Sequence, residues 1–454
     1  RPCLDAVGIL SEDFDRGYLE DVDFCLRARQ LGFRNVCAPS VYVGHAGSKS
    51  FGAEKRSLVV RNTDVLRCRY PTYCFEFGAF DLADPLRPCR EAIERHAYPA
   101  TKRPRLLITG AGAVGAIARE RGRNLAAKGQ SVLIFEVRHR AGGPRVMITD
   151  PAGGVPQSIA FDLSSRADCD SLKAFGHSVR PSRIEILDPA NVPFGLVDVL
   201  IELKTPFDLV IADAGLLGRH GAATLLAATR SVGSHRDVGA RPGGRATPPP
   251  APDEKAWVAR WRDIADAADM ILTPDEQGTA FAAGLLNGRR ICQLEGPSHG
   301  RPAPRRDKKA AGWRLGLLPV RPCAEEKYLM SEVARAFGDA RPDLALTVIG
   351  ATLDDVGLMR IGNTHVTGPV DGSELGHVAD SYGLDVLFAS VTRPLFGHPL
   401  LEAASRTSRP LAYFDWSRGS VAPRTGDLPL DPGLSLQAIV TELDRWMPQA
   451  RQGP

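Results

Sequence analysis

The feature that most constrains this chain is a repeated alternation of short apolar segments with helical ones, which begins at Arg105. In the first series the strand-like segments are residues 106–109, 131–137, 183–187 and 207–212. In a second series, which begins near Trp313, they are residues 314–318, 344–349, 364–367, 386–389 and 410–414. Apolar strands that alternate with helices are typical of parallel sheets covered by helices. The sequence therefore predicts an α/β protein with two Rossmann-like domains in tandem.

The domain boundaries follow from changes in this pattern. Residues 1–80 contain a charged helix and short apolar runs, and the proline-containing stretch 81–102 is typical of a linker. We expect an N-terminal domain at residues 103–308 and a C-terminal domain at residues 309–445. Ligands of doubly wound sheets bind at the carboxyl ends of the strands, where two such domains face each other. The functional site is therefore expected in the cleft between them.

Composition and charge exclude several classes of protein. The chain has 454 residues, of which 43% are hydrophobic, and this length suffices for about three ordinary domains. Its 57 basic residues are spread along the chain and the net charge is only +4, so a nucleic-acid partner is not expected. No run approaches the roughly eighteen apolar residues of a membrane span, and no leader opens the chain. We expect a cytoplasmic protein whose contact with a membrane, if any, is peripheral.

The cysteines and the first residue give two further expectations. No two of the nine cysteines have the short spacing of a zinc site, so we expect reduced thiols and no metal site. The chain begins with Arg1, and densely patterned sequence follows at once. This pattern predicts that the true N-terminus lies upstream.

Three carboxylates, those of Glu20, Asp21 and Asp23, stand at the start of a predicted helix. Acidic side chains stabilise a helix N-terminus by about 0.3–1 kcal/mol each, so a well-capped surface helix explains them without any function. Further along, His45 lies in the segment Gly44-His45-Ala46-Gly47-Ser48. Taken alone, His45 is equally well explained as a hydrogen-bonded loop histidine.

Taken together, these segments resemble the acceptor-side half of glycosyltransferase family 2, whose members carry a Tyr-x-Glu-Asp-x-Asp helix and a His-x-Gly-Ser segment. The resemblance covers about residues 5–80. It implies a C-terminal fragment of a GT-A-type α/β module, in which Asp21 would deprotonate an acceptor hydroxyl and His45 would lie near the diphosphate or a metal. Only an intact family 2 module would need a divalent metal. Since the nucleotide-binding half is absent, we expect this fragment to be inactive.

A glycine-rich loop follows the first strand of the N-terminal domain. Gly110, Gly112 and Gly115 form a Gly-x-Gly-x-x-Gly pattern, and Glu136 ends the next strand. This is the dinucleotide-binding fingerprint with its ribose-binding acid, which favours an NAD-dependent oxidoreductase. The second Rossmann-like series argues against that function, because a dehydrogenase would need a substrate domain there. Two interpretations remain beside it: a loop next to the acceptor or diphosphate of a glycosyltransferase, and a structural tight turn.

The C-terminal domain carries the segment Phe396-Gly397-His398-Pro399-Leu400-Leu401-Glu402-Ala403-Ala404. With residues 257–275, 346–350, 367–370, 385–390 and 409–415 it resembles glycosyltransferase family 4 and similar GT-B enzymes, over residues 103–445. The resemblance implies that Phe396 and Gly397 lead to a helix whose N-terminus faces the diphosphate of a nucleotide sugar. It also implies that Glu402 accepts hydrogen bonds from the ribose hydroxyls, each worth roughly 1.5–3 kcal/mol. Outside this match, Glu402 would be an ordinary helix glutamate facing water.

The chain departs from the family 4 pattern in two places. Where the family has a second glutamate that contacts the donor sugar, this chain has Pro394, so Arg393 or backbone groups would have to replace that contact. The cation that offsets charge on the leaving diphosphate is expected to be Lys327, with Arg321 as the rival. Either residue could instead be a solvated charge at a helix end.

These observations lead to one hypothesis and two alternatives. The hypothesis is the transfer of a sugar from a nucleotide-sugar donor to a saccharide or lipid-linked saccharide acceptor, in the synthesis of bacterial surface polysaccharide. The family 4 resemblance implies that the anomeric configuration is retained and that the second module needs neither a metal nor a cofactor. The alternatives are a catalytically degraded GT-B module that only binds, supported by Pro394, and the NAD-dependent oxidoreductase.

Overall fold

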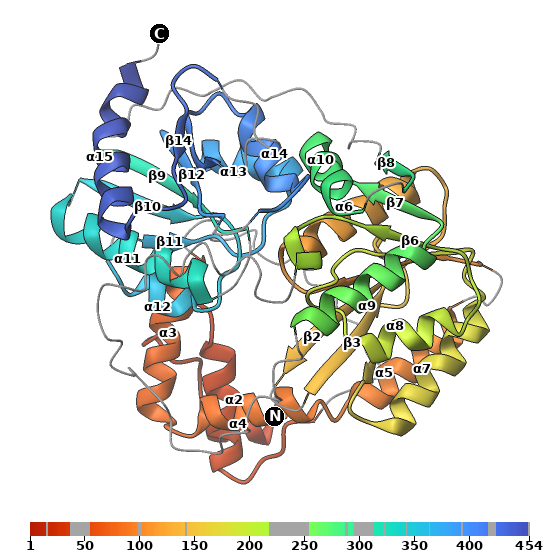
Figure 1. Cartoon of the computed structure of the whole chain (residues 1–454). Helices are drawn as coiled ribbons and strands as arrows, with labels where there is room; N and C mark the ends of the chain where they lie inside the picture. The colour runs from red at the N-terminus through yellow and green to blue at the C-terminus, as the bar shows by residue number, and fades with distance from the viewer. Residues whose placement is uncertain are drawn as a thin grey trace.

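The computed structural model confirms the α/β class and the two Rossmann-like domains in tandem (Figure 1). A set of helices at the N-terminus precedes the two domains. The structure describes residues 1–14, 17–36, 55–98, 102–140, 143–217, 254–286, 289–294, 312–320, 324–341, 343–362, 364–391, 394–415 and 424–452.

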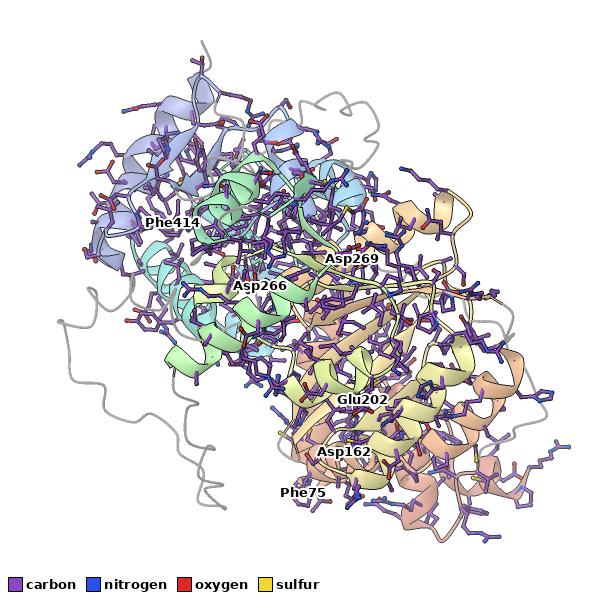
Figure 2. The ribbon with its side chains drawn as sticks, turned by 45° about the vertical axis from the view of Figure 1, so that its right-hand side comes forward. Phe75, Asp162, Glu202, Asp266, Asp269 and Phe414 are labelled. Atoms are coloured by element: carbon purple, nitrogen blue, oxygen red, sulfur yellow. The ribbon has the colours of Figure 1, made fainter. Side chains whose placement is uncertain are left out.

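All the regular secondary structure in the described residues of the N-terminal part is helical. Its helices are α1 (Pro2–Val7), α2 (Glu20–Gln30), α3 (Lys55–Arg69), α4 (Tyr73–Ala83) and α5 (Arg87–Ala97). No strand is found in the described part of residues 1–80, so the α/β character predicted for this fragment is not seen there. The apolar core of this part is small, and Phe75 of α4 is exposed on the molecular surface (Figure 2).

The stretch predicted to be a linker contains α5. Pro88 stands in the first turn of this helix, where a proline costs no hydrogen bond, so it starts the helix instead of preventing it. The carboxylate of Glu94 accepts a hydrogen bond from the backbone of Ser158 at 2.8 Å, which attaches α5 to the N-terminal domain. On the other side, Asp64 of α3 forms an ion pair with Arg360 of the C-terminal domain at 2.6 Å. The N-terminal helices therefore contact both domains.

The N-terminal domain is built on an eight-stranded sheet with the order β4-β3-β2-β1-β5-β6-β7-β8. The strands are β1 (Arg105–Gly110), β2 (Val132–Arg140), β3 (Gly143–Thr149), β4 (Ile159–Asp162), β5 (Arg183–Ile186), β6 (Phe207–Val210), β7 (Met270–Thr273) and β8 (Ile291–Gln293). The four strands predicted in this domain all pair in parallel, as expected. In contrast, β2, β3 and β4 form an antiparallel meander that the sequence pattern did not predict.

Helices cover both faces of this sheet. They are α6 (Ala113–Ala127), α7 (Arg166–Val179), α8 (Phe194–Ile201), α9 (Glu254–Ala267) and α10 (Glu276–Leu285), with a 3-10 turn, η2 (Ala214–Leu217). Successive side chains of a strand point to opposite faces. Ile108 of β1 accordingly packs in the core shared with α7 to α10, whereas Leu107 packs in the core beneath α6.

The C-terminal domain has a six-stranded sheet with the order β11-β10-β9-β12-β13-β14, in which every pair is parallel. The strands are β9 (Trp313–Leu318), β10 (Leu344–Val348), β11 (Thr364–Val366), β12 (Val386–Ala389), β13 (Leu411–Phe414) and β14 (Leu428–Leu430). The helices are α11 (Ala324–Ala340), α12 (Asp355–Met359), η5 (Gly372–Glu374), α13 (Leu375–Ser381), α14 (Pro399–Arg406) and α15 (Leu436–Gln452). Phe414 is buried in the core between the sheet and helices α11 and α15 (Figure 2).

The two domains share one apolar core. It joins Val114 and Ile117 of α6 to Leu318 of β9 and Leu401 of α14, all of them buried. Beside it, Arg123 of α6 pairs with Asp371 of the C-terminal domain at 3.1 Å. The domains are therefore packed against each other, with α6 and α14 at their interface.

A buried carboxylate stands on the face of the N-terminal sheet that carries α6. Glu185 of β5 is fully buried and accepts hydrogen bonds from Arg105 at 2.5 Å and from Arg121 at 2.5 and 2.8 Å. Burial alone would raise the pKa of Glu185, but the hydrogen bonds and positive charges of Arg121 and Arg105 outweigh it and lower the pKa. Glu185 is therefore ionised at neutral pH and holds two arginines in place.

The variant Glu185→Gln should be clearly less stable than the wild type. It leaves two partly buried guanidinium groups without their counter-charge, which should lower the free energy of unfolding by about 2–3 kcal/mol. Urea unfolding followed by circular dichroism measures this loss. Glu332→Gln is the matched control, since Glu332 pairs with Arg335 at the exposed surface of α11 and should lose less than about 0.5 kcal/mol. Equal stability of the two variants would contradict a structural role for Glu185.

Candidate functional site

The glycine-rich loop of the N-terminal domain is closely packed. Gly112 has a φ of +106° and precedes α6 directly. A Cβ on Gly110 would lie 2.4 Å from the Cβ of Asn191, and a Cβ on Gly115 would lie 2.8 Å from the carbonyl oxygen of Gly110. Each glycine of the fingerprint is therefore required by the fold itself. This favours the tight-turn interpretation, for which no ligand is needed.

Glu136, the predicted ribose-binding acid of the fingerprint, is held by two arginines. Arg119 donates to one carboxylate oxygen at 2.6 Å and Arg138 to the other at 2.7 Å, and the residue is only 6% exposed. A ribose would have to share a nearly buried carboxylate that already accepts from two arginines. This arrangement gives Glu136 a structural role and counts against the oxidoreductase.

Residues 395–397, just before α14, contact the N-terminal domain. The backbone N–H of Phe396 donates to the carbonyl oxygen of Ala212 at 2.9 Å, beside a bridge between Leu395 and Asp213. The ring of Phe396 is 2% exposed, belongs to the core of the N-terminal domain and lies 5.3 Å from the ring of Phe281, between centroids. Phe396 was expected to bind the donor. Its side chain instead fills the core of the opposite domain, because an aromatic ring gains most where water is excluded.

Gly397 continues this contact between the domains. Its N–H donates to one oxygen of the Asp275 carboxylate at 2.7 Å, while the other oxygen of that carboxylate caps α10 through Gly278. Gly397 has a φ of +62°, and a Cβ there would lie 2.2 Å from the Cβ of Pro274. Only glycine therefore fits at this position, for reasons of both backbone conformation and space.

His398 caps α14 as a neutral imidazole. Its Nδ1 accepts a hydrogen bond from the N–H of Leu400 at 3.2 Å, and the residue is 1% exposed. Burial, aided by the positive charge of Arg119, lowers the pKa of His398 from 6.5 to about 3. The sequence analysis did not predict a role for His398, although its position just before Pro399 is typical of a helix cap.

Glu402 faces a pocket between the two domains. It lies in the first turns of α14, its side chain is 19% exposed, and Arg406 lies one turn further along the helix with 3.4 Å between their charged atoms. The pocket has a volume of about 820 Å³ and is also lined by Gly397, Pro399 and Pro274. Glu402 is thus the predicted donor-site residue whose side chain lines this pocket.

The rest of this pocket comes from residues that the sequence analysis did not single out. Helix α6 contributes Ile117, Glu120, Arg121 and Asn124 to its wall, and Lys128, which directly follows the helix, contributes as well. These positions recur every three or four residues, so they share one face of the helix. That spacing was visible in the sequence, but nothing in it showed that α14 would lie opposite.

Of the two cations predicted for the diphosphate, Lys327 and Arg321, the structure describes Lys327. Lys327 lies at the start of α11 and pairs with Asp354 at 3.0 Å, and it does not line the pocket. The pKa of Asp354 is lowered by the N–H of Gly357 and by Lys327. Arg321 and Arg393 lie outside the described residues.

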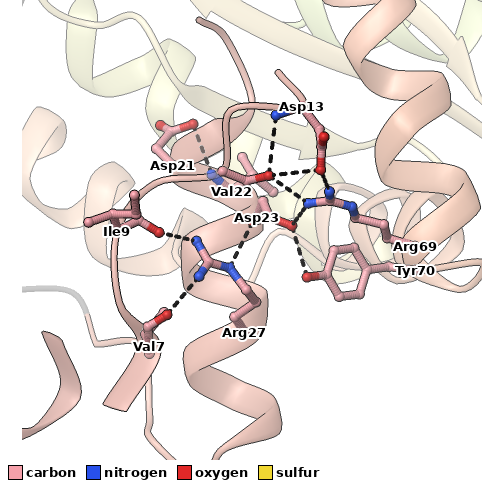
Figure 3. Close-up of polar contacts among 10 residues, drawn as sticks. Val7, Ile9, Asp13, Asp21, Val22, Asp23, Arg27, Arg69 and Tyr70 are labelled. Carbon is pink, nitrogen blue, oxygen red and sulfur yellow. Dashed lines mark hydrogen bonds and ion pairs between the residues drawn. The ribbon is translucent and has the colours of Figure 1, made fainter. Parts of the chain in front are cut away.

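Of the three acidic residues in the first turn of α2, Asp23 has a clear structural role. Asp23 is fully buried and accepts from Arg27 at 2.9 Å, Arg69 at 3.0 Å and Tyr70 at 2.9 Å (Figure 3). With three donors on it, Asp23 serves the packing of α2 against α3. Asp21, the predicted base, is exposed.

No catalytic arrangement is seen around Asp21 and Glu20, the other residues predicted in this fragment that the structure describes. The Oδ1 of Asp21 accepts from the adjacent Val22 N–H at 2.9 Å, and the Oε2 of Glu20 is buried without a hydrogen-bond partner. His45 lies outside the described residues. Within the described part of the chain no group of histidine, cysteine and acidic side chains could hold a metal ion, and none of its helices is long and apolar enough to cross a membrane.

The variant Gly397→Ala should weaken the contact between the domains. The added Cβ would collide with Pro274, and the alanine would have to adopt a positive φ. Together these effects should lower the free energy of unfolding by about 2–3 kcal/mol. Gly383→Ala is the matched control, because Gly383 has a φ of +60° but its Cβ would come no closer than 3.7 Å to its neighbours. Thermal unfolding should show a larger loss for Gly397→Ala, and equal losses would mean that the contact with Pro274 contributes nothing.

Protonation of His398 should make stability depend on pH. Its folded-state pKa lies below its unfolded value, so the stabilisation is complete above pH 6.5 and is lost as the pH falls toward 3, by about 1.4 kcal/mol per unit. The variant His398→Asn can still cap α14 but cannot titrate. Urea unfolding at pH 7 and pH 5 should give a wild-type decrease that exceeds the variant's by about 2 kcal/mol. The same decrease in both proteins would refute the assignment.

No protein-family model matches the chain. The uncharacterized protein y4gI of Sinorhizobium fredii is 33% identical to it over 102 residues, which are 22% of this chain and 10% of that protein. The chain thus spans about a tenth of the length of the curated relative that it matches.

Several solved structures are similar to the chain at low identity. Anabaena HepE in complex with UDP and glucose is 10% identical with a TM-score of 0.44, and the match covers 77% of this chain and 92% of HepE. The S. aureus MnaA–UDP co-structure is 11% identical with a TM-score of 0.46, covering 77% and 90%. The pneumococcal O-GlcNAc transferase GtfA in complex with UDP and GlcNAc is 8% identical with a TM-score of 0.45, covering 77% and 92%.

Proposed function

We propose that this chain is a glycosyltransferase of the GT-B type, which moves a sugar from a nucleotide-sugar donor to a saccharide acceptor. The observation that carries this proposal is the position of Glu402. Its carboxylate is partly exposed, lies at the start of α14 and faces a pocket between two Rossmann-like domains. A carboxylate in such a place can accept both protons of a vicinal diol, which is how it would hold the ribose of the donor.

The chemistry needs few groups besides this anchor. The bond between the anomeric carbon and the diphosphate oxygen breaks, and the diphosphate leaves with the electron pair. An oxygen of the acceptor bonds to the anomeric carbon as its proton leaves to a base or to water. The charge that builds on the diphosphate needs a cation, for which Lys327 is our candidate, with Arg321 as the alternative. Arg393 or backbone groups would instead contact the donor sugar, in place of the glutamate that Pro394 replaces.

The biological setting of the reaction is a further part of the proposal. The resemblance of residues 103–445 to family 4 supports a role in bacterial surface polysaccharide synthesis, in the cytoplasm, with a saccharide or lipid-linked saccharide as acceptor. The resemblance of residues 5–80 to family 2 supports a fused, inactive fragment. Neither part affects the test of donor binding.

A second candidate is a GT-B module that binds its ligand without turnover. Burial of Phe396 in the opposite domain favours it, because the loop expected to contact the donor is engaged in a contact between domains. Pro394, which replaces a glutamate of the family pattern, favours it as well. The arginines on Glu136 count against the oxidoreductase.

Donor binding should depend on Glu402. Calorimetry with UDP-glucose, UDP-N-acetylglucosamine and GDP-mannose should find one donor that binds, and Glu402→Ala should weaken it about tenfold to a hundredfold, equivalent to roughly 1.5–3 kcal/mol. The matched control is Glu442→Ala. Glu442 also pairs with an arginine of its own helix, Arg445, but lies on α15 away from the pocket.

The outcomes separate the candidates. A donor that binds through Glu402 and releases its diphosphate with a saccharide acceptor supports the transferase. Binding through Glu402 without release, over a broad panel of acceptors, supports the module without turnover. Binding of NAD that is insensitive to Glu402→Ala, with no nucleotide sugar bound, would overturn both.

A further inference from the structure

The N-terminal helices expose large apolar side chains that lie close together in the chain. Most of the exposed large hydrophobic side chains among the described residues belong to residues 1–98. Three of them are phenylalanines of α4: Phe75, which Figure 2 labels, is 81% exposed, Phe77 is 59% exposed and Phe80 is 56% exposed. Single apolar side chains are normal at a protein surface, whereas neighbouring ones mark a site of interaction. Helix α4 is therefore a candidate interaction surface.

Helix α4 is apolar on more than one side. Phe75 and Phe77 point to nearly opposite sides of the helix, because two residues correspond to a rotation of about 200°. The sequence of α4 contains no lysine or arginine, and its Glu76 is already paired with Arg29 at 2.8 Å. A helix without a polar face is normally buried in protein, whereas a helix that lies on a membrane surface carries a cationic polar face. The composition of α4 therefore suits a protein partner and not an anionic lipid surface.

Helix α5 turns its polar side toward the N-terminal domain, because that side covers the edge of a sheet. Strand β4 is an edge strand of the eight-stranded sheet. The backbone N–H of Ser158 donates to Glu94 at 2.8 Å. The N–H of Ala160, two residues further along the same edge, donates to Glu91 at 3.0 Å. An uncovered edge would offer such donors to another chain, so these two carboxylates block the edge and fix which side of α5 faces the domain.

The outer side of α5 is consequently apolar. Leu86, Cys89 and Ile93 follow each other at intervals of three and four residues, which places them on one side of the helix. Leu86 is 47% exposed, Ile93 is 69% exposed, and Cys89 is an exposed free thiol. Arg90, beside this stripe, is paired with Asp84 at 2.7 Å. The three side chains of the stripe and the three phenylalanines of α4 are called the α4–α5 surface below.

The size and the charge of the α4–α5 surface fit a second copy of the same surface. A whole aromatic side chain buries roughly 150–250 Å², so the exposed fractions of the three phenylalanines leave about 300–500 Å² open in each copy. Two copies would cover about 600–1,000 Å² from these rings alone, and the α5 stripe brings the total near the roughly 1,200 Å² at which stable interfaces begin. The ion pairs of Glu76 and of Arg90 neutralise the charges beside this surface. Two identical surfaces can therefore meet without repulsion between like charges.

We propose that the α4–α5 surface is covered by the same surface of a second copy of this chain, in a dimer with two-fold symmetry. Such pairing is the commonest arrangement of soluble oligomers, since one surface then serves both partners. The polar side of α5 stays on the sheet edge in this dimer. The inference goes beyond the proposed function and holds whether or not the chain transfers a sugar, because none of the six side chains lines the pocket at Glu402.

Sedimentation equilibrium of the full chain tests the dimer. Between about 1 and 100 µM it should show monomer and dimer in a concentration-dependent equilibrium, as expected at the lower end of interface size. Phe75→Glu and Ile93→Glu should each weaken the dimer at least about tenfold, since a two-fold interface then contains two added carboxylates. Both side chains are largely exposed in a single copy, so the variants should fold like the wild type, which circular dichroism checks.

The matched control is Leu353→Glu. Leu353 is also an exposed apolar side chain, at 56%, but it belongs to the C-terminal domain, so this variant should leave the dimer unchanged. A chain that stays monomeric up to about 100 µM would overturn the proposal. So would a dimer that resists both Phe75→Glu and Ile93→Glu, or one that Leu353→Glu weakens equally. Binding of a monomer to phosphatidylglycerol vesicles that these two variants abolish would assign the surface to a membrane instead.

Discussion

The burial of Phe396 in the N-terminal domain is the contact on which the arrangement of this molecule depends. It fixes the segment before α14, and through that segment it fixes the distance between Glu402 and α6. Two backbone hydrogen bonds, to Ala212 and to Asp275, make the contact directional as well as apolar. An aromatic ring in a core contributes several kcal/mol, so the domains are held together by more than a flexible hinge. The pocket is thus a product of domain packing.

Buried charge shapes the same pocket from below. Glu185 is fully buried, yet its two arginines keep it ionised. The face of the sheet beside α6 is therefore polar at this position, although apolar cores lie on both faces of the sheet. Ion pairs of this kind contribute little net stability and instead fix the positions of side chains. Here they present two guanidinium groups to the pocket.

Much of the fold could be predicted from the sequence, because buried parallel strands read as apolar runs. The strands around Leu107, Ile186 and Leu387 were found in this way. The antiparallel strands β3 and β4 were not predicted, since apolar and polar residues alternate only weakly there. Helix α5 was not predicted, because its proline was interpreted as a sign of a linker. At the candidate site, Glu402 was predicted through resemblance. The arginines on Glu136 and the place of Phe396 were not predictable, because their partners are distant in sequence and no local pattern encodes them.

The N-terminal helices have a mechanical consequence. Helices α3, α4 and α5 follow each other closely from Lys55 to Ala97, so they form a continuous helical strap. One end of the strap is tied to the C-terminal domain through Asp64, and the other is tied to the N-terminal domain through Glu94. A hinge motion that separates the domains at the strap would have to break one of these ties. The strap thus adds one polar contact with each domain to the shared core at α6 and α14, and it links the two domains through a third segment of the chain.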